Sequence, residues 1–394
     1  MFYLMVYCVA FYSLAAISVR DLLHGISFLD AFICLQLFKV CTLLLITIEL
    51  FDNSYYLGEV MKKTLATVLG LVVSVPAFAN DVVNIYSFRQ PYLIQPILDD
   101  FTKQTGIKTN VVFANKGLIE RVKREGKHSK ADLVLTSNFS ALVQLEDLNL
   151  TQAIKSDSVN KNVPAAFRDG DGQWIALTKR VRNVYSSKER VGKLPELTYE
   201  DLADPKYKGQ ICTRSGKHPY NLGLVASMIA HHGEAETKTW LEGVKSNLAR
   251  KPQGNDRAQV KAVKEGLCNL ALGNSYYLGK MLQDDEQKSW AEAVNINFPN
   301  QTNRGSHINV SGAVITKYAK NAENALKLIE YMTDNKAQNM YASLNMEYPV
   351  KAGVELSSLV ASWGSFKEDS LPLDEISKYR PLALKLIDEV KFDL

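Results

Sequence analysis

The fold of this chain is decided by the stretch that begins Val82-Val83-Asn84-Ile85-Tyr86-Ser87. This short apolar run predicts a buried strand that ends in a polar loop. An amphipathic helix is expected next, over 91–105, with Gly106 ending it. The alternation continues with strands expected at 108–114 and 131–136. A βαβαβ order predicts a parallel sheet covered by helices, so the fold class is α/β.

A second α/β unit is expected over 197–293, after a strand at 174–185 that carries three cations. These cations are Lys179, Arg180 and Arg182. Because cations are unusual in a core strand, we interpret this strand as a crossover between two lobes, with its cations facing a cleft. Strands at 294–298 and 308–315 are expected to cross back. Folds of this kind bind ligands between the lobes, at the carboxyl ends of the strands.

The expected domain boundaries follow from these two crossovers. Lobe 1 comprises 80–180 and 300–345, and lobe 2 comprises 181–299. The remaining residues, 346–394, are expected to form a helical C-terminal segment that packs on the lobes.

The residues before the first strand carry an export signal. A basic start at Met61-Lys62-Lys63 is followed by an apolar run and by Ala77-Phe78-Ala79. This pattern predicts a secretory signal peptide at 61–79, cleaved after Ala79, and hence a periplasmic protein. Residues 1–60 have two interpretations. They are an upstream extension from a mis-assigned start codon, or a membrane anchor, because the uncharged residues 1–19 are long enough to span.

Composition excludes several classes of function. The chain has 394 residues, 22% charged residues and a formal net charge of +4, so we expect no nucleic-acid partner. No Ser/His/Asp set, phosphate-binding glycine loop or Glu-x-x-His repeat stands out, so an enzyme has no positive support.

Cysteine usage differs between the leader and the rest of the chain. Beyond residue 60 the chain has only Cys212 and Cys268, whose spacing matches no zinc pattern. Each lies in a short apolar run. In an oxidising compartment we expect them to form a disulfide between adjacent strands, and two buried free thiols are the alternative.

A tyrosine pair lies where a strand is expected to end and a helix to begin, in Gly273-Asn274-Ser275-Tyr276-Tyr277-Leu278-Gly279. Ser275 is the expected N-cap, which places Tyr276 and Tyr277 in the first helical turn. Tyr220 also precedes an expected helix. Alone, such a pair is more often surface or a stacking platform.

Arginines are expected near these phenols. They are Arg89, Arg180 and Arg182. Phenolate is a hard oxygen donor, and with an ordinary pKa near ~10 it needs a strong Lewis acid such as Fe³⁺ to displace its proton at neutral pH. Three phenolates would neutralise Fe³⁺ and leave coordination positions for a small anion such as carbonate.

Several sequence words strengthen this interpretation. They are Tyr86-Ser87-Phe88-Arg89, Gly254-Asn255-Asp256-Arg257-Ala258-Gln259-Val260-Lys261-Ala262-Val263, Asn274-Ser275-Tyr276-Tyr277, Phe298-Pro299-Asn300-Gln301, Arg304-Gly305-Ser306-His307-Ile308-Asn309-Val310-Ser311-Gly312 and Glu347-Tyr348-Pro349-Val350. With them, residues 81–394 resemble the ferric-iron-binding periplasmic proteins of bacterial ABC importers. The resemblance implies a monomeric, two-lobed type II (Venus-flytrap) binding protein that delivers iron to an inner-membrane permease. It also implies that the iron ligands are Tyr220, Tyr276 and Tyr277.

One departure from the family pattern concerns the first loop. Several relatives carry His-Tyr after the Tyr-Ser-x-Arg word, where this chain has Gln90 and Pro91. The resemblance therefore implies the subtype in which three tyrosines and an exogenous anion hold the metal, and Tyr92 is not expected to be a ligand. Arg89 is the first candidate to contact the anion, Arg180 the second and Arg182 the third.

Two alternatives remain open at this point. The first is a binding protein that captures a small organic or inorganic anion through the arginines, without metal. The second is a membrane-anchored sensor subunit that uses residues 1–60 as its anchor.

Overall fold

The computed structural model describes residues 81–394. The expected signal peptide at 61–79 and the extension at 1–60 lie outside the described residues. Within 81–394, no helix combines the length and the apolar character needed to cross a membrane.

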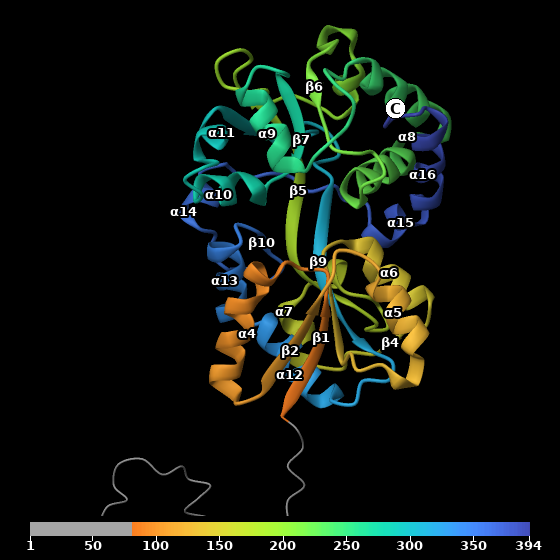
Figure 1. The fold of residues 1–394 in the computed structure, drawn as a ribbon, viewed down its shortest axis with the longest axis vertical. Coiled ribbons are helices and arrows are strands. Elements are labelled where there is room, and N and C mark those ends of the chain that lie inside the picture. Colours follow the sequence, from red (N-terminus) through yellow and green to blue (C-terminus); the bar gives the residue numbers. More distant parts are fainter. Residues whose placement is uncertain (1–80) are drawn as a thin grey trace, which may run out of the picture. The chain divides into compact units, whose positions relative to one another are not determined.

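Strands and helices alternate along the described chain (Figure 1). The strands are β1 (Val82–Ser87), β2 (Lys108–Phe113), β3 (Leu133–Thr136), β4 (Thr151–Gln152), β5 (Ile175–Ser187), β6 (Ile211–Cys212), β7 (Leu270–Asn274), β8 (Val294–Asn297), β9 (Ile308–Thr316) and β10 (Tyr348–Pro349). The α-helices are α4 (Pro91–Thr105), α5 (Leu118–Glu125), α6 (Phe139–Asp147), α7 (Asp157–Asn162), α8 (Pro219–Ser246), α9 (Asp256–Lys264), α10 (Tyr276–Leu282), α11 (Lys288–Glu292), α12 (Ala322–Met332), α13 (Asn335–Leu344), α14 (Ser358–Ala361), α15 (Leu373–Lys378) and α16 (Arg380–Glu389).

The first strand and helix form as their local sequence predicts. Pro91 occupies the first turn of α4, where its missing N–H costs nothing. The apolar face of the helix is buried, and Gly106 ends it in the left-handed conformation, with its N–H donating to the carbonyl of Thr102. The sequence-based bounds of β1 and α4 are confirmed.

The lobes are organised on two parts of one sheet, whose main strand order is β2-β1-β3-β9-β5-β7-β6. Strand β5 belongs to both parts. Its residues up to Val181 pair with β9, and from Arg182 onward they pair with β7. The expected crossover strand is therefore confirmed. Figure 1 shows β5 and β9 running side by side through the junction.

The return connection differs from the prediction. We expected the strand at 294–298 to cross back, but β8 pairs with β5 at 184–187 and stays in the second lobe. The other strand that was expected to cross back, at 308–315, does so as β9, which pairs with β5 from Val181 to Ile175. The return crossover is therefore β9 and not β8.

Helix α8 contains an internal break. Gly233 has φ 79° and ψ 176°, which is not helical, so the element consists of two helices that meet at this residue. Separate helices were expected near 222–231 and 237–247, and the break at Gly233 confirms that division.

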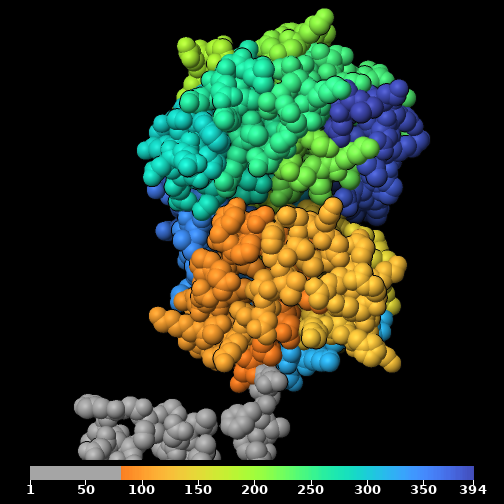
Figure 2. Space-filling model, in the orientation of Figure 1, coloured from red at the N-terminus to blue at the C-terminus, as the bar shows by residue number. Residues whose placement is uncertain are grey.

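The C-terminal segment contacts both lobes. Strand β10 pairs with β5 in the first lobe. Helix α16 packs on α8 of the second lobe, and α15 contacts both α8 and α6. Figure 2 shows the dark-blue C-terminal residues lying beside the green surface that contains α8.

Cys212 and Cys268 form a disulfide. Cys212 lies in β6, which pairs in parallel with β7, and Cys268 lies two residues before β7. The bond links residues 56 positions apart in sequence. Closing a loop of this length in the unfolded chain typically stabilises a fold by about 2–4 kcal/mol.

Candidate metal centre

The tyrosine pair lies where β7 ends and α10 begins. Tyr276 and Tyr277 occupy the first turn of α10, as expected. Ser275 occupies the N-cap position of α10 as expected, but its side chain makes no capping hydrogen bond. Its hydroxyl instead accepts a hydrogen bond from the backbone N–H of Val181 at 3.2 Å, and its own N–H donates to the carbonyl of the same residue. Ser275 thus fixes the start of α10 to the crossover strand.

Two glycines around the pair allow close packing. A Cβ atom at Gly273 would lie 2.5 Å from the ring of Tyr185. A Cβ at Gly279 would lie 2.5 Å from the side chain of Met346, which belongs to the C-terminal segment. Both contacts are shorter than a side chain tolerates, so glycine at these positions lets β7 and α10 approach their neighbours.

Tyr220 lies at the start of α8, directly after Pro219. Its backbone N–H donates to Nδ1 of His218 at 3.3 Å, and the two rings meet edge to face, with centroids 4.6 Å apart. Burial and the nearby charge of Arg214 lower the pKa of His218 to about 3. The imidazole is therefore neutral at physiological pH and acts as the N-cap of α8.

The structure brings the three phenols together. The rings of Tyr276 and Tyr277 stack with centroids 4.2 Å apart. Burial raises the pKa of Tyr276 well above its ordinary value, and the phenols of Tyr220 and Tyr277 raise it further. Burial also raises the pKa of Tyr277, with Tyr220 as the second cause. The phenols of Tyr276 and Tyr277 therefore stay protonated at neutral pH until a cation of high charge displaces their protons.

The pair belongs to the second lobe but also touches the first. Tyr276 is only 6% exposed and packs with the apolar core of the first lobe, and the half-buried Tyr277 lies against the same core. A ligand held by these side chains is therefore positioned where the lobes meet.

The predicted arginines are buried and have carboxylate partners, so their cations do not simply face an open cleft as expected. Both terminal nitrogens of Arg89 donate to the carboxylate of Glu347 at 2.7 Å. Arg180 contacts the same carboxylate at 3.4 Å. Arg182 donates to Asp256. Lys179, in turn, pairs with Glu368.

Among the three predicted arginines, Arg180 has the clearest contact with the phenols. Its guanidinium carbon lies 5.7 Å from the centroid of the Tyr220 ring. Burial is the main cause of the raised pKa of Tyr276, and Arg180 acts in the opposite direction. Arg89 also lies within electrostatic reach of Tyr276. Arg182 donates hydrogen bonds to two polar side chains beside the tyrosines, those of Asn221 and Asn274.

Sequence reasoning missed three residues of this centre, namely Arg214, Asp256 and Glu347. Arg214 lies 5.3 Å from the centroid of the Tyr220 ring and pairs with Asp256. Asp256 and Glu347 are both fully buried. Asp256 and Glu347 both belong to the sequence motifs that carry the family resemblance, and this was the signal by which they could have been found. Nothing local in the sequence indicated that each carboxylate would be shared by two arginines.

Comparison with known proteins places this arrangement in a family. A model of the bacterial extracellular solute-binding protein family matches residues 128–363, which is more than half of the chain. The chain belongs to this family. The resemblance inferred from the sequence words and the expected two-lobed α/β fold are both confirmed.

This solute-binding protein is similar to iron-binding relatives over most of its length. Apo ferric ion-binding protein A of Pasteurella haemolytica is 56% identical, with a TM-score of 0.78, over 80% of this chain and 99% of that one. A Trichodesmium protein in complex with iron and citrate ligands is 39% identical, with a TM-score of 0.75, over 79% and 99% of the two chains. Iron uptake protein A1 of Synechocystis is 42% identical over 310 residues, which cover 78% of this chain and 86% of the relative.

Histidine and carboxylate side chains of the solute-binding protein offer no competing site in the described part of the chain. Within residues 81–394, no group of three or more His, Cys, Asp or Glu is placed to hold a metal ion. The adjacent His231 and His232 bond to different carboxylates, those of Asp369 and Glu200. Tyr92 is 51% exposed.

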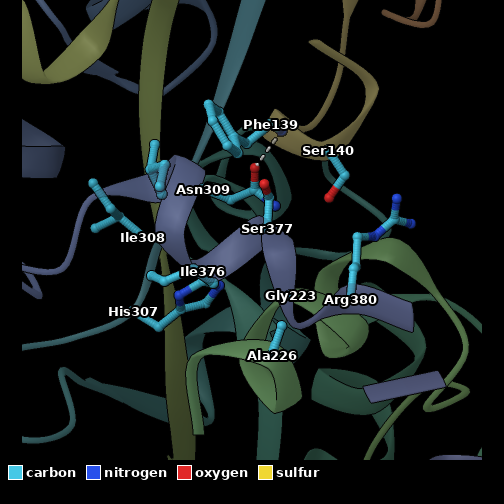
Figure 3. Close-up of a pocket in the computed structure, with 11 residues that line it drawn as sticks. Phe139, Ser140, Gly223, Ala226, His307, Ile308, Asn309, Ile376, Ser377 and Arg380 are labelled. Carbon is cyan, nitrogen blue, oxygen red and sulfur yellow. Dashed lines mark hydrogen bonds between the residues drawn. The ribbon is translucent and has the colours of Figure 1, made fainter. Parts of the chain in front are cut away.

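A separate cavity is lined by residues of α6, α8, α15 and β9 and by none of the three tyrosines. Figure 3 shows it between α6, which contributes Phe139 and Ser140, and α8, which contributes Gly223 and Ala226. His307 also lines it, with 3% of its surface exposed and no hydrogen-bond partner for either ring nitrogen in the described structure.

His307 makes the stability of this solute-binding protein sensitive to acid. Burial lowers the pKa of His307 from 6.5 to about 4, against the opposing effect of Asp369. Below pH 6.5 the unfolded chain binds the proton and the folded chain does not, so stability falls by about 1.4 kcal/mol per pH unit until about pH 4. Between pH 7.5 and pH 5, we expect the free energy of unfolding to fall by about 2 kcal/mol less for His307→Phe than for the unsubstituted protein.

The measurement is the free energy of unfolding in urea at both pH values. The exposed His128 provides a matched control, and His128→Gln should follow the unsubstituted protein. Equal losses for His307→Phe and the unsubstituted protein would show that His307 titrates alike in both states.

Proposed function

We propose that this protein captures Fe³⁺ outside the cytoplasm through the phenolate oxygens of Tyr220, Tyr276 and Tyr277, with carbonate as a synergistic anion. The observation that carries the proposal is the convergence of three phenols where the lobes meet, with the Tyr276 and Tyr277 rings stacked and guanidinium groups over the Tyr220 ring. The names of the relatives support Fe³⁺ as the metal, since they include a ferric ion-binding protein and a complex that contains iron.

The phenols suit a ferric ion because of their charge. Fe³⁺ is a hard cation and prefers anionic oxygen ligands, and each phenol gives up its proton when it coordinates. The raised pKa of Tyr276 and Tyr277 means that this deprotonation requires a strong Lewis acid. The ferric ion meets that requirement, and its three charges are balanced by three phenolates.

The anion completes the coordination of the ion. Among the three predicted arginines, we choose Arg180 as the first candidate to contact carbonate. Within residues 81–394, it is the one of these three whose guanidinium lies over the ring of a proposed ligand. The short first loop of the family pattern cannot contribute a strong ligand here, since it carries Gln90 and Pro91.

Capture and delivery involve the two lobes. The second lobe carries the tyrosines, and the first lobe covers them, because Tyr276 packs with its core. Metal binding selects the closed form, which a monomeric protein presents to an ABC permease in the inner membrane. No catalytic step is required. The signal peptide at 61–79 would bring the protein to the periplasm.

Elemental analysis and an iron titration test this function. Protein purified without added metal should contain one iron per chain, and apoprotein titrated with ferric nitrilotriacetate should develop the reddish colour of tyrosinate charge transfer. The colour should develop fully with bicarbonate and weakly in a bicarbonate-free buffer. A parallel titration with citrate in place of bicarbonate identifies which anion supports binding.

Two outcomes favour the alternative functions. Metal-free protein that retains a small anion would contradict iron capture and support an anion-binding protein. Membrane fractionation that recovers the exported protein with residues 1–60 attached would support an anchored sensor subunit.

A further inference from the structure

One buried carboxylate fastens the chain segments that carry the three tyrosines. Asp256 is the first residue of α9 and has no exposed surface. One of its oxygens accepts from Arg182, and the other accepts from Nη1 of Arg214 at 2.6 Å.

Arg182 extends this network to the tyrosine loops. Its Nη2 donates to the side chain of Asn221 at 2.6 Å, and its Nη1 donates to the side chain of Asn274 at 3.2 Å. Asn221 follows Tyr220, and Asn274 precedes Tyr276 by two residues. Asp256 thus lies at the centre of contacts that reach both loops.

Arg214 is the member of this network that faces the phenols. Its guanidinium carbon lies 5.3 Å from the centroid of the Tyr220 ring, and that of Arg180 lies 5.7 Å from the same centroid. An arginine side chain stays protonated in proteins, so this guanidinium is a permanent positive charge beside the ring of a proposed ligand, Tyr220.

The charges of the two buried clusters match those of a loaded site. Fe³⁺, three phenolates and a carbonate dianion together carry two negative charges. Glu347 is shared by Arg89 and Arg180, and Asp256 is shared by Arg182 and Arg214. Each cluster therefore has one positive charge more than its carboxylate balances. In a buried environment such charges interact strongly, so the two clusters together offset the charge of the loaded site.

We propose that Arg214 is a further residue of the ferric site and that Asp256 is the positioning residue that holds it there. This inference rests on the proposed function. Arg214 stabilises the phenolate forms of Tyr220 and Tyr277 once iron has displaced their protons. Asp256 fixes the guanidinium of Arg214 in that position. In other metal sites, groups behind the ligands orient them in the same way.

The test compares iron affinity and the charge-transfer band among variants. We expect Arg214→Met to bind Fe³⁺ about 10–100-fold more weakly in competition with a chelator. Removing the cation leaves the phenolates richer in electrons, so the charge-transfer band should move to longer wavelength. Arg214→Lys keeps the positive charge without the planar guanidinium, so it should recover part of the lost iron affinity and reverse part of the band shift.

Arg304 provides the matched control. Its side chain is 14% exposed and pairs with Glu200, while that of Arg214 is 12% exposed and pairs with Asp256. Arg304→Met should leave both the iron affinity and the band position unchanged. If Arg214→Met also left them unchanged in a protein whose unsubstituted form binds iron with the tyrosinate band, the inference about Arg214 would fail alone. An unsubstituted protein without that band would instead contradict the proposed function.

A double-mutant comparison tests the role of Asp256. Asp256→Asn should weaken iron binding in the unsubstituted background and have a clearly smaller effect in the Arg214→Met background, since it acts through Arg214. Equal effects in both backgrounds would overturn the positioning role. If Asp256→Asn does not fold, Asp256→Glu keeps the charge while moving it, and the same comparison applies.

Discussion

Tyr276→Phe and Tyr277→Phe are expected to lose tight Fe³⁺ binding and the reddish tyrosinate colour. Each substitution removes a single phenol oxygen and retains the ring, so the stacking of the two rings at 4.2 Å is preserved. Because a ligand is lost, we expect the affinity to fall by more than the ~10–100-fold typical when a group that supports a ligand is removed. The same result is expected for Tyr220→Phe.

Tyr92→Phe is the matched control for these variants. Tyr92 is half exposed and stands one position away from the tyrosine that several family members use. The Tyr92→Phe variant should bind iron as tightly as the unsubstituted protein and show the same colour. Tight, coloured iron binding by both Tyr276→Phe and Tyr277→Phe would show that the metal centre has been placed wrongly.

Glu347→Gln is expected to lower the free energy of unfolding by about 3–5 kcal/mol. The carboxylate of Glu347 is fully buried and bonds to Arg89 through two hydrogen bonds of 2.7 Å, with Arg180 at 3.4 Å. Its replacement by a neutral amide leaves two guanidinium groups without the charge that compensates them. A buried charge that loses its partner is far more costly than an exposed one.

Glu368→Gln tests whether burial is the cause. Glu368 pairs with Lys179, but its side chain is 29% exposed, so its loss should cost less than about 1 kcal/mol. Both variants are compared by guanidinium denaturation with the disulfide intact. Equal losses for the two variants would contradict the assignment of Glu347 as the balancing charge of a buried cluster.

Local sequence predicts the elements whose ends are set by neighbouring residues. The bounds of α4 follow from Pro91 at its start and Gly106 at its end, both of which act within one turn. Likewise, β7 and the start of α10 follow from a short apolar run and the residues after it. Ser275 is the N-cap residue as expected, but its hydroxyl accepts a hydrogen bond from the N–H of Val181, which is distant in sequence, and makes no capping bond.

The partners of the buried arginines lay beyond sequence reasoning. Arg89 and Glu347 are 258 residues apart, and Arg182 and Asp256 are 74 residues apart. Such pairs form only once the lobes have folded, so the sequence alone does not show which carboxylate balances each arginine of the crossover strand. The motifs of the family resemblance contain both carboxylates, and the structure assigns them to particular arginines.

The approach of Tyr220 to the tyrosine pair was expected from the resemblance and from strand ends that share one edge. Strands β6 and β7 pair in parallel, so the loop after β6 that leads to Tyr220 and the end of β7 at the tyrosine pair lie at the same edge of the sheet. Periodicity does not encode that strand pairing. Arg214 lies in a loop without regular structure, so its position over the Tyr220 ring had no sequence pattern from which to be inferred.

The most direct test of the central claim is anomalous diffraction at the iron absorption edge from crystals of the iron-loaded protein. We predict one iron ion, bonded to the Oη atoms of Tyr220, Tyr276 and Tyr277, with an anion between the iron and Arg180. An iron peak elsewhere, or one that lacks these phenol oxygens as ligands, would contradict it.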